Sequence, residues 1–127
     1  MQTSTKNDAS KIILLAEDDK LSVSYFKAVL SGEGFEVIHV DNGIDAVETV
    51  RNNPDLSVVL MDIKMPQKSG VEAAREIRSF NPDLPLIAQT AFALAGDKES
   101  ILDAGFNAYI TKPVSREDLL AIVKRFL

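Results

Sequence analysis

Apolar residues fall along the chain in short uninterrupted runs, separated by longer stretches in which apolar and polar residues alternate. Three runs are continuously apolar, namely residues 12–16, 58–61 and 86–88. Such runs are typical of strands that are covered on both faces of a parallel sheet, so we expect these three at its centre. Residues 35–40 include Glu36 and His39, and this mixed pattern favours a strand near the edge. Residues 108–110 are a short fifth candidate.

Between these runs, apolar residues at helical spacing predict a helix after each expected strand. The apolar stripes of the first two helices are Leu21, Tyr25, Ala28 and Val29, and then Ile44, Val47 and Val50. Ser69 with Glu72, and Ser115 with Asp118, have the spacing of capping pairs that begin the third and fifth helices. The fourth helix is expected over about residues 96–105.

Five strands that alternate with five helices predict an α/β fold, a doubly wound parallel sheet with helices on both faces. The chain has 127 residues, which is room for about one domain. We therefore expect a single domain over residues 11–127, preceded by a polar, flexible leader or linker over residues 1–10. In such sheets ligands bind beyond the carboxyl ends of the strands, so the residues that follow each strand are the candidates for function.

The amino-acid composition limits the kinds of molecule that the protein is expected to bind. Fourteen basic against 19 acidic residues give a net charge of −5, which leaves no surplus of positive charge for nucleic acid or an anionic membrane. The sequence contains no cysteine, which excludes disulfides and zinc–thiolate sites. No apolar run approaches the roughly 20 residues that span a bilayer. We expect a cytoplasmic protein with no direct nucleic-acid binding and no membrane contact.

Charged and hydroxyl side chains follow four of the five expected strands. They are Glu17, Asp18 and Asp19 after the first, Asp62 after the third, Thr90 after the fourth and Lys112 after the fifth. Carboxylates gathered at one edge of a sheet repel each other unless a cation neutralises them. Mg²⁺ suits this role because it prefers oxygen ligands, so Asp18, Asp62 and a nearby carbonyl would suffice to hold it. Asp19 could equally cap the helix that follows.

Two of these side chains suit a phosphoryl group. The Lys112 ammonium and the Thr90 hydroxyl can both donate hydrogen bonds to phosphoryl oxygens. An aspartate at the same place could accept the group, since carboxylates act as nucleophiles when aspartyl phosphates form. The residues therefore predict Mg²⁺-assisted phosphoryl transfer onto Asp62.

The order of these motifs resembles the receiver domain of two-component response regulators. The matching pieces are Glu17-Asp18, Asp62-Ile63-Lys64-Met65-Pro66 with Gly70, Thr90-Ala91, and Tyr109 three residues before Lys112-Pro113. The resemblance covers residues 11–127 and implies a flavodoxin-like sheet with strand order 2-1-3-4-5. It also implies that a histidine kinase or a histidine phosphotransfer protein donates a phosphoryl group from a phosphohistidine to Asp62.

The resemblance further implies a role for each site residue. Asp18, Asp62 and the backbone carbonyl of Lys64 would bind Mg²⁺, with Glu17 acting through a water. Thr90 and Lys112 would hold the phosphoryl oxygens, and Thr90 and Tyr109 would move when the domain switches. The output surface would be formed by the helix near residues 96–105, the strand at 108–110 and the helix after Ser115. The Lys112-Pro113 peptide is expected to be cis.

Other interpretations follow from particular residues. A flavin carrier of this fold would not place three acids after the first strand, and a phosphatase of the haloacid dehalogenase type needs an acid where Lys64 stands. The alternative that stays open is an interaction module of receiver fold that signals without phosphate. The segment at residues 88–93 resembles receivers of hybrid sensor kinases, so the chain could be such a receiver or a stand-alone regulator, either monomeric or a weak phosphorylation-dependent dimer. We also hypothesise that the bulk of Phe92 slows hydrolysis of the phosphoryl group.

Overall fold

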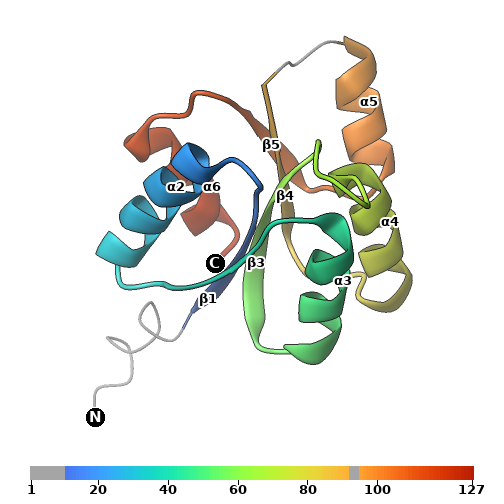
Figure 1. Cartoon of the computed structure of the whole chain (residues 1–127), viewed down its shortest axis with the longest axis horizontal. Helices are drawn as coiled ribbons and strands as arrows, with labels where there is room; N and C mark the ends of the chain where they lie inside the picture. The colour runs from blue at the N-terminus through green and yellow to red at the C-terminus, as the bar shows by residue number, and fades with distance from the viewer. Residues whose placement is uncertain (1–10, 92–94) are drawn as a thin grey trace.

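The computed structural model describes residues 11–91 and 95–127, which form strands and helices in strict alternation (Figure 1). The strands are β1 (Ile12–Ala16), β2 (Glu36–Val40), β3 (Leu56–Asp62), β4 (Leu86–Thr90) and β5 (Ala108–Thr111). The helices are α2 (Lys20–Gly32), α3 (Gly43–Asn52), α4 (Gly70–Phe80), α5 (Ala95–Asp103) and α6 (Arg116–Arg125). The expected leader at residues 1–10 and the expected role of Phe92 fall outside the described residues.

The strands form one sheet in the order β2-β1-β3-β4-β5, and every neighbouring pair is parallel. This confirms the predicted doubly wound, flavodoxin-like sheet. β3 and β4 are each longer than the apolar runs that predicted them, so Asp62 and Thr90 are the last residues of their strands. β2 lies at one edge with Glu36 and His39 exposed, as the mixed pattern indicated.

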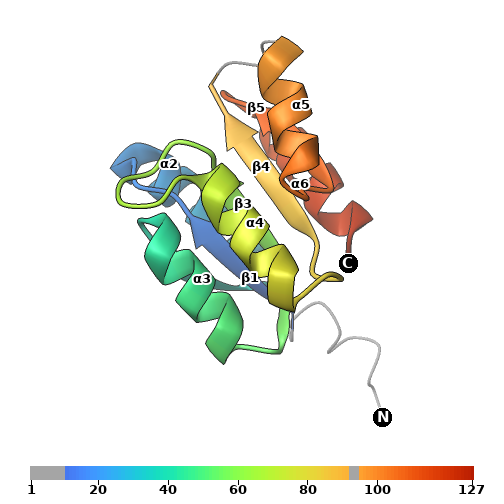
Figure 2. The ribbon, with the colours of Figure 1, turned by 90° about the vertical axis from the view of Figure 1, so that its right-hand side faces the viewer.

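Helices cover both faces of the sheet and divide the core into two clusters. Figures 1 and 2 show α2 and α6 on one face and α3, α4 and α5 on the other. The first face buries the side chains of Ile13, Leu15, Leu60 and Ile87 against Phe26 and Leu119. The second face buries Leu14, Met61 and Ala88 against Val47, Ile77 and Ile101. Among the described residues, no helix is both long and apolar enough to cross a membrane.

The capping predictions are confirmed, while four of the predicted apolar positions are wrong. The Ser69 side chain accepts a hydrogen bond from the Glu72 amide in a complete capping box, and Ser115 accepts one from the Asp118 amide. Leu21 is 83% exposed, Ile44 is 45% exposed, and Tyr25 and Ala28 are exposed as well, although all four belong to the expected stripes. Leu21 and Ile44 lie in the first turns of their helices, beyond the carboxyl edge of the sheet, where no apolar surface remains for them to cover. Further along α2, the buried face is formed by Phe26, Val29 and Leu30.

Candidate functional site

Three charged side chains from three strand ends meet at the carboxyl edge of the sheet. The Lys112 Nζ donates a hydrogen bond to Glu17 Oε1 at 2.6 Å and a longer one to Asp62 Oδ2 at 3.4 Å. Glu17 is fully buried and Asp62 is 9% exposed. The ammonium therefore bridges two carboxylates in a place that is largely shielded from water.

The register of the sheet explains this meeting. Ala16 of β1 pairs with Met61 of β3, so Glu17 and Asp62 lie beside each other one residue further on. Side chains alternate along a strand, and the residues two positions before the charged ones all lie on the face covered by α2 and α6. Glu17, Asp62 and Lys112 therefore lie on that same face and can reach one another.

The two acids that follow Glu17 take different positions. The Asp19 side chain accepts a hydrogen bond from the Ser22 amide at 2.9 Å, so it is the N-cap of α2. This bond lowers the pKa of Asp19. Asp18 instead joins Glu17 and Asp62 in a group whose carboxylate oxygens all lie within 4.8 Å of one another. The open interpretation of Asp19 is thus settled in favour of capping.

Burial and the bridge act in opposite directions on the protonation of the buried groups. Burial raises the pKa of Glu17, although the hydrogen bonds from Lys112 and from the Asp19 amide oppose the rise. Burial lowers the pKa of Lys112, but the hydrogen bond to Glu17 and the charges of Asp62 and Glu17 outweigh it, and the net shift is upward. The site thus holds its lysine charged.

The loop after β3 is held in place from both sides. The Lys64 amide donates to Asp62 Oδ1 at 3.1 Å, and the Gly70 amide donates to the Ile63 carbonyl at 3.0 Å. A Cβ on Gly70 would lie 2.3 Å from the Asp62 carbonyl oxygen, so only glycine permits this close approach. The loop therefore fixes one oxygen of Asp62 and brings the Lys64 backbone beside it.

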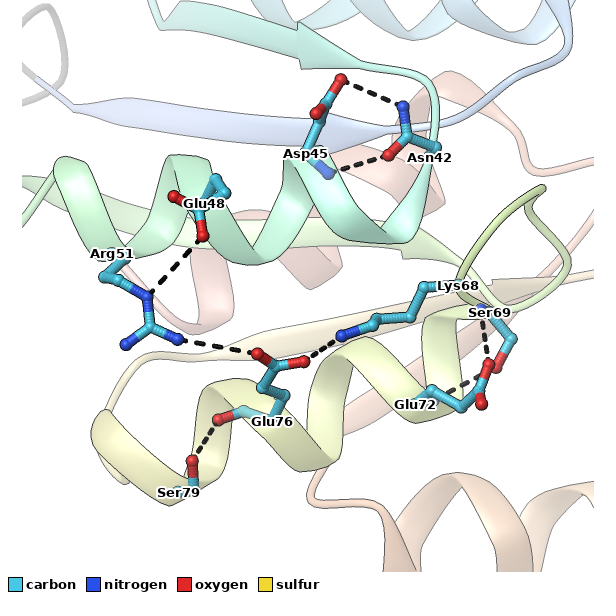
Figure 3. Close-up of polar contacts among 9 residues, drawn as sticks. All are labelled: Asn42, Asp45, Glu48, Arg51, Lys68, Ser69, Glu72, Glu76 and Ser79. Atoms are coloured by element: carbon cyan, nitrogen blue, oxygen red, sulfur yellow. Dashed lines mark hydrogen bonds and ion pairs between the residues drawn. The ribbon is translucent and has the colours of Figure 1, made fainter.

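A second set of contacts ties the far end of this loop to two helices (Figure 3). Lys68 pairs with Glu76 of α4, and Glu76 is 3.6 Å from Arg51 of α3. The Arg51 guanidinium also lies 4.2 Å from the centre of the Phe80 ring. Polar contacts between α3 and α4 therefore support the loop that carries Lys64.

Thr90 and Tyr109, the predicted switch residues, lie on the other face of the sheet. Thr90 is buried, and its carbonyl accepts a hydrogen bond from the Lys112 amide at 2.8 Å. Tyr109 is partly buried against the cluster under α3, α4 and α5, and the Lys98 ammonium lies 5.7 Å from its ring centre. The Lys112-Pro113 peptide is cis, as expected. The roles of these residues stay predictions.

Three features near the site were not anticipated. His39 Nε2 lies 2.8 Å from the Glu17 carbonyl oxygen, so a side chain of the edge strand β2 contacts the backbone at the end of β1. A groove of about 620 Å³ opens beside Lys112, lined among others by the exposed Leu21 and by Tyr25. Gln89 is fully buried next to Asp62, whereas the apolar run that predicted β4 ended at residue 88 and did not include it.

The donor chemistry of the acidic group fits Mg²⁺. All three side chains offer carboxylate oxygens, which Mg²⁺ prefers, and one or two carboxylates usually suffice to hold it. The exposed Asp18 leaves the group open to solvent on one side, as an ion that retains water ligands requires. Glu17, Asp18 and Asp62 are the residues that could hold such an ion.

Comparisons with known proteins agree with this geometry. The family model of the response regulator receiver domain matches residues 13–124. The polar-differentiation response regulator DivK of Brucella anthropi is 36% identical over 120 residues, which are 92% of this chain and 96% of DivK.

Two solved structures extend the comparison. The receiver domain of the sensor histidine kinase PA1611 from Pseudomonas aeruginosa, solved with a magnesium ion in its active-site cleft, superposes with a TM-score of 0.86 at 38% identity, covering 92% of this chain and 97% of that one. The receiver domain of the yeast (Saccharomyces cerevisiae) response regulator Ssk1, solved with the histidine phosphotransfer protein Ypd1, gives a TM-score of 0.86 at 26% identity and covers 92% and 88% of the two chains.

Proposed function

The chain belongs to the response regulator receiver domain family and is a receiver domain of two-component signalling, and from that premise we propose that Asp62 is its phosphoacceptor. The observation that carries the proposal is the bridge from the Lys112 ammonium to Glu17 and Asp62, beside the carboxylate of Asp18. It supports the proposal because a carboxylate oxygen of Asp62, a positive charge and two further carboxylates lie within one small site.

The donor in this proposal is a phosphohistidine on a partner protein. One carboxylate oxygen of Asp62 forms a bond to phosphorus as the N–P bond of the phosphohistidine breaks, and the electron pair of that bond stays on the imidazole nitrogen. Lys112 and Thr90 donate hydrogen bonds to the oxygens of the phosphoryl group and oppose its negative charge. The phosphoryl group is later removed by hydrolysis, in which water attacks phosphorus, the acyl phosphate bond breaks to restore the Asp62 carboxylate, and inorganic phosphate leaves with the oxygen of the water. Both reactions are self-catalysed events of a signalling protein.

In the proposal Asp18, Asp62 and the Lys64 carbonyl hold Mg²⁺, and Glu17 contacts it through a water. When bound, Mg²⁺ supplies positive charge to the phosphoryl oxygens and removes the repulsion among the carboxylates. Glu17 suits the indirect role because it is fully buried and already bound to Lys112 and to the Asp19 amide.

The groove beside Lys112 supports a protein donor. Leu21 is 83% exposed and Tyr25 is 40% exposed on α2, and both line this groove together with Val114. An apolar surface next to the acceptor lets a partner bury side chains while its phosphohistidine reaches Asp62. The Ssk1 receiver was solved with a histidine phosphotransfer protein, which supports a partner of that class here.

The proposal includes the switch that the sequence predicts. Phosphorylation would draw the Thr90 hydroxyl toward the phosphoryl group and turn Tyr109 inward, and the change would be presented on the surface of α5, β5 and α6. The proposal also retains a cytoplasmic location, no direct nucleic-acid binding, and a monomer or weak phosphorylation-dependent dimer. Light scattering before and after phosphorylation tests the last of these.

The decisive experiment is intact mass spectrometry after incubation with acetyl phosphate, with and without Mg²⁺. We expect a Mg²⁺-dependent gain of one phosphoryl group in the wild type and none in Asp62→Asn. Asp55→Asn is the matched control, since it makes the same change at an exposed position on the loop before β3, at the other end of the sheet. Some receivers accept phosphate only from their kinase, and such a receiver would still bind beryllofluoride. A module that signals without phosphate would neither react with acetyl phosphate nor bind beryllofluoride, so failure of both would favour the module.

A further inference from the structure

Gln89 is a buried polar residue that the site described so far does not use. Its side chain is fully buried, and neither Nε2 nor Oε1 has a hydrogen-bond partner within the described part of the chain. Buried amides are almost always paired, because an unpaired one loses its bonds to water and gains none in return. A carboxamide held in this state in β4 therefore calls for a partner that arrives in another state of the protein.

The sheet places Gln89 beside the phosphoacceptor. Gln89 pairs in register with Asp62 on one side and with Ile110 on the other. Ile87 and Ile110 both pack under α2 and α6, and alternation puts the Gln89 side chain on this same face. It thus lies on the face from which Lys112 and Glu17 reach Asp62.

The path of Lys112 brings its ammonium across β4. Lys112 follows β5, whereas Glu17 follows β1, and β4 and β3 lie between these strands in the sheet. The 2.6 Å bond from Nζ to Glu17 therefore requires the lysine side chain to extend across the end of β4, on the face that Gln89 occupies. Any movement of the ammonium from Glu17 back toward its own strand carries it toward β4, the strand that holds Gln89.

We propose that Gln89 is a positioning residue whose carboxamide oxygen accepts a hydrogen bond from the Lys112 ammonium when Asp62 carries a phosphoryl group. The inference rests on the proposed function, in which Lys112 leaves Glu17 to contact a phosphoryl oxygen. A lysine ammonium has three protons, and the two carboxylates use two of them in the free protein. Gln89 holds the ammonium over β3 and β4, where the phosphoryl oxygens lie, and among the described residues no hydrogen bond of the amide has to break for it to turn.

The direct test is a measurement on the wild-type protein. We expect a scalar coupling across the hydrogen bond between Lys112 ¹⁵Nζ and Gln89 ¹³Cδ in the presence of Mg²⁺ and beryllofluoride, and none in the free protein. The coupling between Lys112 and Glu17 in the free protein is the positive control, because that bond is already 2.6 Å long. A beryllofluoride complex that shows no coupling between Lys112 and Gln89 overturns the proposal.

A variant tests the consequence for the reaction. Gln89→Met removes the carboxamide while keeping an unbranched side chain of similar length, and Ile87→Met is the control on the same face of β4. We expect phosphorylation by acetyl phosphate to slow about tenfold or more in Gln89→Met and to stay within about twofold in the control, while the melting temperature of Gln89→Met rises. A wild-type rate in Gln89→Met overturns the inference. If the wild type itself neither gains a phosphoryl group nor binds beryllofluoride, the proposed function fails first, and the two failures are distinguishable.

Discussion

Replacing Lys112 by methionine tests whether the lysine holds the acidic site together. Methionine keeps much of the length of the side chain and removes only its charge. The ammonium lies 2.6 Å from Glu17 and 3.4 Å from Asp62. At an effective dielectric constant of about 20 these separations correspond to about 6 and about 5 kcal/mol of gross attraction, most of which offsets the cost of removing the charges from water.

The net loss is smaller than the gross attraction. Removing one partner of a buried pair costs about 3–5 kcal/mol because the remaining charge is uncompensated. The Lys112 side chain is 21% exposed, so water reaches part of the site. We therefore expect the free energy of unfolding to fall by about 3 kcal/mol, at the lower end of this range. For a domain of this size such a loss lowers the melting temperature by about 10 °C.

Mg²⁺ provides the second half of the test. A ligand that binds only the folded state stabilises it by an amount that rises with the logarithm of its affinity, and without Lys112 the carboxylates lose the ammonium that bridges them. Millimolar Mg²⁺ should therefore raise the melting temperature of Lys112→Met by more than it raises that of the wild type.

Urea unfolding and thermal melts, each with Mg²⁺ and with a chelator, measure both effects. Lys124→Met is the matched control, since Lys124 is half exposed in a surface pair with Glu33 and should lose little. A loss below about 1 kcal/mol in Lys112→Met, or an equal response of variant and wild type to Mg²⁺, would refute the view that the acidic group depends on this lysine.

Three further predictions concern the metal, the loop and acid stability. Mg²⁺ should raise the melting temperature of the wild type, and Asp18→Asn should weaken that response in a calorimetric titration. Gly70→Ala should cost about 1–3 kcal/mol in urea unfolding and slow phosphorylation, because its Cβ meets backbone at 2.3 Å, whereas Gly32→Ala has open space and should be neutral or stabilising. The hydrogen bond from Lys124 lowers the pKa of Glu33 below its ordinary 4.5. The ionised Glu33 side chain therefore stabilises the folded state fully above pH 4.5, and this stabilisation is lost as pH falls through the lowered pKa. Glu33→Gln should therefore flatten the fall in stability below pH 4.5, and an unchanged acid unfolding curve would contradict this assignment.

Much of the fold could be predicted because the strands of a parallel sheet have a recognisable sequence pattern. Strands buried on both faces need continuous apolar runs, and a charge directly after such a run marks the carboxyl edge. That reasoning placed Glu17, Asp62 and Lys112 at one edge before their distances were known. It assigned Asp18 to the metal but left Asp19 open between the site and capping, because capping depends on backbone geometry at the start of α2 that the sequence does not reveal.

The exposed residues show a different limit. Helical spacing assigned Leu21 and Ile44 to the core, since periodicity identifies a face of a helix but not where the sheet beneath it ends. Both lie in first turns beyond that end, and Leu21 forms part of the groove beside Lys112. Gln89 was missed for the opposite reason, because a single polar residue in an otherwise apolar strand gives no indication of whether it is paired.

The distribution of hydrogen bonds in the free site bears on how Asp62 stays reactive. Lys112 holds Glu17 at 2.6 Å and Asp62 only at 3.4 Å, while Asp62 Oδ1 accepts from the Lys64 amide at 3.1 Å. A carboxylate in a short, strong ion pair gives up electron density to its partner and is a poorer nucleophile. Because the fully buried Glu17 takes the shorter bond, the lysine is kept charged and close without binding the acceptor tightly. If Asp62 is the phosphoacceptor, as proposed, Glu17 would serve the reaction by binding Lys112 until the phosphoryl oxygens compete for the ammonium.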